Sequence, residues 1–77
     1  MTAQEVKDYI EKELKGAKAC KYSEPDFVMA RCLGVVLFAS NYIELAEDRR
    51  ELTEWWDYEM RDKFEEFKKE RKNAGLN

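Results

Sequence analysis

Residues 27–46 read FVMARCLGVVLFASNYIELA, and this stretch decides the fold. At the 100° per residue of an α-helix, its apolar side chains point in nearly every direction between Phe27 and Ala39. A helix that is apolar on all sides must be surrounded, so the stretch predicts a central helix. A strand over residues 33–39 is the alternative, because periodicity alone cannot type a short apolar run. We favour the helix because the run continues to Ala46 without turn residues.

Two amphipathic patterns flank this stretch, and each predicts a helix with one buried face. The first opens on a capping box, in which Thr2 and Glu5 satisfy each other's backbone N–H groups. Its apolar residues recur at spacings of three and four: Ala3, Val6, Ile10, Leu14 and Ala17. The second pattern has spacings of four, four, four and three: Leu52, Trp56, Met60, Phe64 and Phe67. Gly16 either ends the first helix or lies inside it.

The breaks between the helices are marked by capping residues. We expect Ser23 to be the N-cap of the second helix, with Pro25 in its first turn, and Asp48 to be the N-cap of the third. The cations of residues 68–72 suit the negative end of the third helix's own dipole. The sequence therefore predicts an all-α fold, an antiparallel three-helix bundle with helices at about 3–18, 24–46 and 49–72. Residues 1–77 would form a single helical domain.

Composition and charge exclude several classes of protein. The chain is 44% hydrophobic and 40% charged, with 3 Gly and 1 Pro, which excludes a disordered or low-complexity chain. No signal-peptide pattern opens the sequence, and the longest apolar region contains Arg31 and is too short to span a bilayer. The two cysteines do not resemble a disulfide scaffold. We therefore expect a cytoplasmic protein without a membrane partner, of a size that suits a bacterial or mobile-element accessory protein.

The residues needed for catalysis or metal binding are scarce. The chain has no histidine, so it lacks the commonest general base and the commonest metal ligand. Its carboxylates alternate with lysines and arginines along the third helix, which is typical of a solvated face. We therefore predict no enzyme activity, no catalytic residue, no cofactor, no metal and no small-molecule substrate. Cys32 is expected to be buried, and a redox role for Cys20, beside Lys18 and Lys21, stays open.

A nucleic-acid-associated regulator is the alternative function. Its contacts would come from Arg49, Arg50 and the lysines of the first helix and the break after it, which are Lys12, Lys15, Lys18 and Lys21. These lysines spread around the helix, and acidic residues interleave with them. Glu51 and Glu54 follow the two arginines at once and would repel phosphate. Nucleic-acid binding is therefore disfavoured.

The stretch LTEWWDYEM, residues 52–60, divides between core and surface. On a helical wheel Trp56 and Met60 fall on the core stripe, whereas Trp55 and Tyr58 flank it. Tryptophan and tyrosine are enriched at binding hot spots. The second helix also has more apolar surface than two amphipathic neighbours can cover, so a second chain is a natural cover.

We therefore predict a non-catalytic protein–protein interaction module. It would bind itself as a homodimer, or bind another protein, through the second helix, with help from the tryptophan–tyrosine edge. The predicted interface residues are Met29, Leu33, Val36, Leu37, Trp55 and Tyr58.

Overall fold

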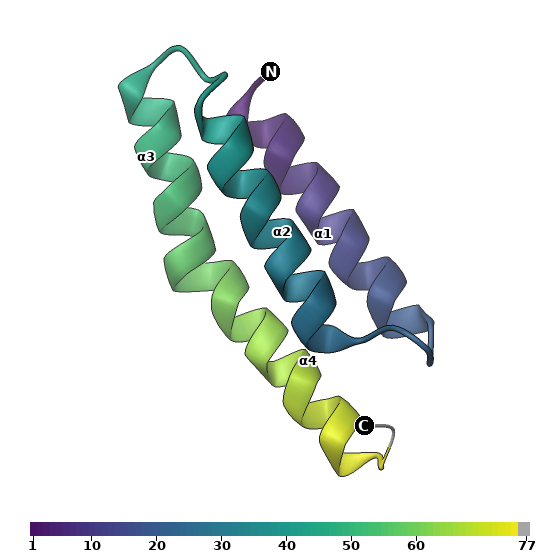
Figure 1. The fold of residues 1–77 in the computed structure, drawn as a ribbon. Coiled ribbons are helices and arrows are strands. Elements are labelled where there is room, and N and C mark those ends of the chain that lie inside the picture. The colour runs from purple at the N-terminus through teal and green to yellow at the C-terminus, as the bar shows by residue number, and fades with distance from the viewer. Residues whose placement is uncertain (76–77) are drawn as a thin grey trace.

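The computed structural model describes residues 1–75 and shows an all-α three-helix bundle. Its first two helices are α1, Ala3–Ala19, and α2, Pro25–Ser40. The third is continuous but has three parts, α3 (Ala46–Trp55), a π-helical turn η1 (Trp56–Met60) and α4 (Arg61–Asn73). Each helix runs opposite to the one before it, as predicted (Figure 1). Residues 33–39 are helical, and Gly16 lies inside α1.

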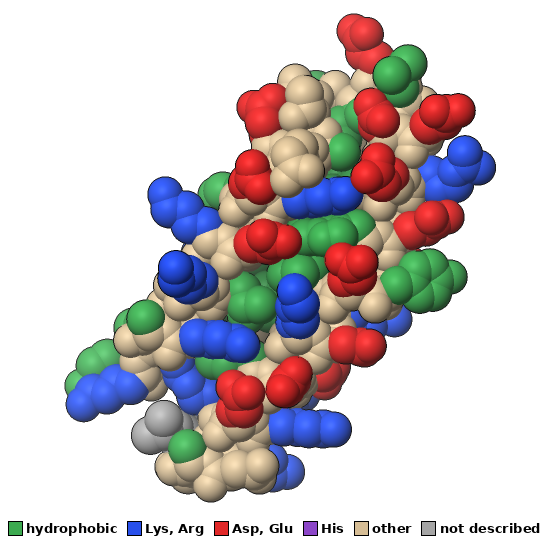
Figure 2. Space-filling view, turned by 180° about the vertical axis from the view of Figure 1, so that it is seen from behind, with side chains coloured by type: hydrophobic (Ala, Val, Ile, Leu, Met, Phe, Trp, Pro, Cys, Tyr) green, Lys and Arg blue, Asp and Glu red, His purple; other side chains and the backbone are tan. Residues whose placement is uncertain are grey.

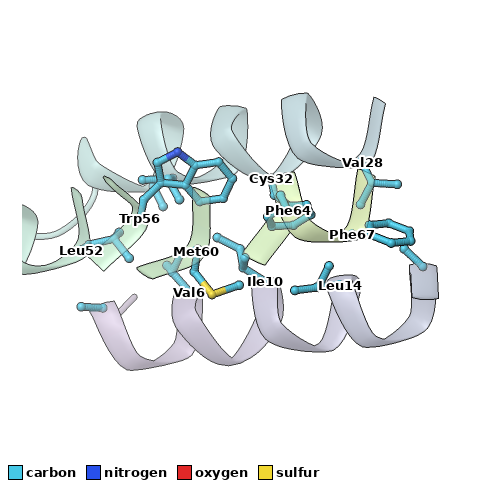
Figure 3. Packing of buried hydrophobic residues seen from close by; sticks show 14 of the residues in the cluster. Val6, Ile10, Leu14, Val28, Cys32, Leu52, Trp56, Met60, Phe64 and Phe67 are labelled. Atoms are coloured by element: carbon cyan, nitrogen blue, oxygen red, sulfur yellow. The ribbon is translucent and has the colours of Figure 1, made fainter. Parts of the chain in front are cut away.

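The core forms where the two predicted stripes meet one side of α2. Every residue of both stripes is buried, and the capping box at Thr2 and Glu5 is present. From α2 the core takes Val28, Cys32, Val36 and Ala39. Figure 3 shows side chains of all three helices pointing into this shared interior. The core therefore uses only one side of α2, although the helix is apolar all round.

The π-helical turn keeps the third stripe on the core. In an α-helix, residues spaced by four drift about 40° per step, so a run of such spacings would carry Phe64 away from Leu52. In η1 the N–H of Arg61 donates to the carbonyl of Trp56, a bond to the fifth residue before it instead of the fourth. The wider turn rotates the following residues by less per residue, and so reduces the angle between Leu52 and Phe64 about the helix axis. As a result Leu52, Trp56, Met60 and Phe64 are all buried.

The connection between the second and third helices differs from the prediction. α2 ends at Ser40, not residue 46, and α3 begins at Ala46, not residue 49. At this end the N–H groups of Asn41 and Tyr42 donate to the carbonyls three residues before them, those of Phe38 and Ala39, which tightens the last turn and closes the helix. Asp48 is not the N-cap; it lies in the first turn of α3, where its charge suits the helix dipole. The N-cap of α2 is likewise Glu24, not Ser23.

Arg71 ties the end of α4 to the end of α1. Its side chain is buried, and its guanidinium donates to the carbonyl oxygens of Ala17, Cys20, Lys21 and Ser23. Those carbonyls form the negative end of α1 and the connection that follows it, which favours a cation there. The sequence suggested that Arg71 serves the dipole of its own helix. Arg71 does lie in the last turn of α4, but its hydrogen bonds satisfy the end of another helix.

Replacing Arg71 should lower the free energy of unfolding more than replacing an exposed arginine. We expect Arg71→Ala to cost about 2–3 kcal/mol, because buried carbonyls lose charged donors. Arg71→Lys should recover only part of this, since an ammonium lacks the planar fork of donors. Urea unfolding followed by circular dichroism measures both.

Arg61→Ala is the matched control. Arg61 lies on the same helix and bonds only to the exposed carboxylate of Asp57 at 3.3 Å, so its loss should cost no more than about 0.5 kcal/mol. Equal losses for Arg71→Ala and Arg61→Ala would contradict the role given to Arg71.

Candidate interaction surface

α2 exposes a band of apolar side chains on the side away from the core. Phe27, Leu37 and Phe38 are 65%, 57% and 63% exposed. Tyr42, just after α2, is 59% exposed, and its ring centroid lies 5.1 Å from that of Phe38. Small exposed residues lie between the large ones. We call this band the α2 outer face; it consists of Phe27, Ala30, Gly34, Leu37, Phe38 and Tyr42.

The predicted interface residues of α2 are only partly on this face. Leu37 is exposed on it, as a surface residue must be. Met29 and Leu33 are half-buried and pack against the core. Val36 is 1% exposed and belongs to the core, so it cannot touch a second chain while the bundle is folded. We therefore remove Val36 from the candidate surface.

Trp55 and Tyr58 lie in a different place from the α2 outer face. Trp55 is half-buried, with the ammonium of Lys7 5.8 Å from its ring centroid, and Tyr58 is 77% exposed. Both line a groove of about 300 Å³ between α1 and the third helix, together with Lys7, Glu51, Glu54 and Glu59. α2 contributes no residue to this groove. The two halves of the predicted interface are therefore not one continuous surface.

The side of the molecule away from the viewer of Figure 1 is highly charged. Figure 2 shows acidic and basic side chains alternating there, with only a narrow apolar strip between the helices. Lys7 and Glu51 form one ion pair across this side, with Nζ and Oε1 3.0 Å apart. This pattern is that of a solvated surface.

Ion pairs border the α2 outer face on both flanks. On one flank Asp26 contacts Lys68 of α4, with Oδ1 and Nζ 3.0 Å apart. The hydrogen bond from Lys68 to that carboxylate raises the pKa of the lysine. On the other flank Arg31 pairs with Glu13 of α1. An apolar centre with a charged rim is the usual anatomy of a protein–protein interface.

Two open grooves lie between α1 and α2, and Tyr9 lines both. One has a volume of about 470 Å³, and Gly16, Val28 and Arg31 are among its lining residues. The other, of about 340 Å³, is lined mainly by apolar groups and includes Met1, Val6 and Val35. Exposed apolar surface is therefore also present in the groove between α2 and α1.

The sequence pattern missed Phe27, Phe38 and Tyr42. All three side chains are apolar, but so are those on the opposite side of α2, and the wheel alone does not show which side meets the core. The missing information is where α1 and the third helix dock. In the structure, the ion pairs of Arg31 with Glu13 and of Asp26 with Lys68 show where α1 and α4 lie against α2. The sequence alone does not reveal these pairs.

The basic residues of the alternative function are scattered. Lys12, Lys15, Lys18 and Lys21 are exposed. Arg49 instead donates to the carbonyl oxygens of Ile43 and Glu44, at 2.6 and 3.0 Å, and fixes the connection before α3. Arg49 is thus engaged within the chain.

The two cysteines have opposite environments. Hydrogen bonds from the Tyr22 backbone and the Ser23 side chain lower the pKa of the exposed Cys20 thiol. Burial raises the pKa of Cys32 to about 11. Cys20 is therefore the more reactive thiol, whereas Cys32 acts as a small core residue.

We expect iodoacetamide to modify Cys20 and to spare Cys32 in the folded protein. Cys20 carries more thiolate near neutral pH, and its rate should fall only at pH values below its lowered pKa. Peptide mass spectrometry over a pH series measures both sites. Unfolding in guanidinium should make the two rates similar; equal rates in the folded protein would contradict the different environments.

Neither a metal site nor a membrane span is found in the described part of the chain. Within residues 1–75, no group of three or more His, Cys, Asp or Glu residues is placed to hold a metal ion. No helix in the same range has both the length and the apolar character needed to cross a membrane. Comparisons with protein-family models, with curated proteins and with solved structures find no significant match.

Proposed function

We propose that this protein is a non-catalytic interaction module that binds a second copy of itself through the α2 outer face. The observation that carries the proposal is the exposure of Phe27, Leu37 and Phe38 on one side of α2 and of Tyr42 in the turn that follows it. The free thiols Cys20 and Cys32 fit a reducing compartment such as the cytoplasm.

The area of this face suits a small homodimer. A large aromatic side chain covers on the order of 150–250 Å² when fully buried, so the exposed parts of the three aromatic side chains, with the smaller Leu37, come to roughly 400–500 Å². A self-complementary face would bury about twice that area, and its charged rim would add to it. The total approaches the roughly 1,000 Å² expected of a specific interface, at the weak end of the range.

The charges around the face favour a protein over an anionic membrane surface or nucleic acid. The chain has a net charge of −3, and Glu24 and Asp26 stand at one end of α2 with Glu44 beyond the other. These carboxylates would be repelled by phosphate. The face itself offers Arg31 as its rim cation, already paired with Glu13. A second copy supplies an apolar face with the same rim.

Light scattering on a sizing column, with reductant, tests the proposal over about 1 µM to 1 mM, since an interface of this size is expected to bind weakly. We expect the wild-type mass to rise towards that of a dimer. Leu37→Glu should abolish the rise, because it places a charge within the apolar part of the buried area.

Tyr22→Glu is the matched control. Tyr22 is an exposed aromatic residue, at 84%, in the connection between α1 and α2 and off the α2 outer face, so its substitution should leave the dimer intact. Circular dichroism checks that both variants are folded. A wild-type monomer at 1 mM, roughly the upper end of the range tested, or a dimer that survives Leu37→Glu, would refute the proposal.

A further inference from the structure

Gly34 lies at the centre of the α2 outer face, and nothing within the chain requires a glycine there. It is exposed in the middle of α2, where glycine disfavours the helix relative to alanine. A Cβ atom built on Gly34 meets no other atom within 4 Å. The absence of a side chain leaves room here for another backbone to approach closely.

The side chains around Gly34 differ in size and in direction about the helix axis. At 100° per residue, Phe27 points within about 20° of Gly34, Ala30 and Phe38 within about 40°, and Leu37 and Arg31 within about 60°. Small side chains thus occupy the middle of the face, and the largest lie towards its ends. A second helix can cross over the middle while the large side chains pack along its sides.

We infer, on the basis of the proposed self-association, that two copies pack α2 against α2 in antiparallel orientation and cross at Gly34. In this orientation the level of Ala30 and Arg31 in one copy meets the level of Leu37 and Phe38 in the other. Leu37 then lies over the small Ala30, and the ring of Phe38 lies beside the Arg31 guanidinium, a favourable cation–π arrangement. The dipoles of the two helices also oppose each other.

The parallel orientation fits the same residues less well. It brings the two Arg31 guanidinium groups to the same level, although Arg31 is the one cation within α2. It also brings the two copies of Asp26 to the same end and aligns the helix dipoles. These like charges are repelled by one another, whereas the antiparallel pair places each Arg31 beside an aromatic ring.

Disulfide mapping distinguishes the two orientations. Ala30→Cys and Leu37→Cys are combined in one chain with Cys20→Ser, which leaves Cys32 in the core. The protein is oxidised at a concentration at which light scattering shows a dimer, then digested with trypsin. Cleavage after Arg31 separates the two introduced cysteines, and tandem mass spectrometry identifies each pair.

Interchain pairs of residue 30 with residue 37 are expected. Pairs of 30 with 30 and 37 with 37 would overturn the antiparallel orientation while leaving the dimer in place. A wild-type protein that stays monomeric would instead refute the self-association itself, so the two failures are distinct.

Two matched glycine variants test the close crossing. Gly34→Ala should raise the dimer dissociation constant at least tenfold, because its Cβ separates the two backbones. Gly16→Ala makes the same change at an exposed position inside α1, where a Cβ also meets no atom within 4 Å. It should change the dissociation constant less than twofold. An unchanged dimer in Gly34→Ala would overturn the crossing at Gly34.

Discussion

The limited circumference that two helices can cover on a third is the constraint on which this molecule depends. α2 is apolar all round, but α1 and the third helix bury only the side that carries Val28, Cys32 and Val36. In a larger protein further elements would cover the rest. In a bundle of this size the remaining side stays in water, and ion pairs to α1 and α4 border it. The stability of the single chain thus comes from one side of α2, and the proposed self-association would use the opposite side.

Two local features let the third helix serve this arrangement along its whole length. The turn η1 realigns the stripe so that Leu52 before it and Phe64 after it both reach the core. Arg71 then fixes the end of α4 against the carbonyls that close α1. The turn η1 corrects the rotation of the apolar stripe about the helix axis, and Arg71 satisfies backbone carbonyl groups at the end of α1. Apolar packing alone would provide neither.

The amphipathic helices were the predictable part of the fold. The stripes of α1 and the third helix and the capping box at Thr2 are local patterns, which a single sequence displays directly. The end of α2 was misplaced because apolar residues continue beyond Ser40 to Ala46, so that apolar periodicity does not register the end of the helix. The hydrogen bonds of Arg71 could not be predicted, because its partners lie far away along the chain.

The candidate surface was predictable only as an excess of apolar area on α2. The excess indicates that some side of α2 must be left uncovered. Because α2 is apolar all round, its sequence does not show which side that is. For this reason Val36 was placed on the surface and Phe38 was overlooked. Trp55 and Tyr58 were correctly expected beside the core stripe. Their distance from the α2 outer face depends on the way in which the helices assemble, which no local pattern contains.

The position of Arg71 also bears on the order in which the chain folds. The guanidinium and the Ala17 carbonyl that it binds are 54 residues apart in sequence. While the chain is being synthesised, α1 can form early, and the carbonyls of Ala17 and Cys20 can accept from the nearby N–H groups of Cys20 and Ser23, but the charged donor of Arg71 is absent until α4 arrives. Contacts of such long separation form late, because loop closure must precede them. The hydrogen bonds that tie the end of α1 to Arg71 can therefore form only after the last helix has docked.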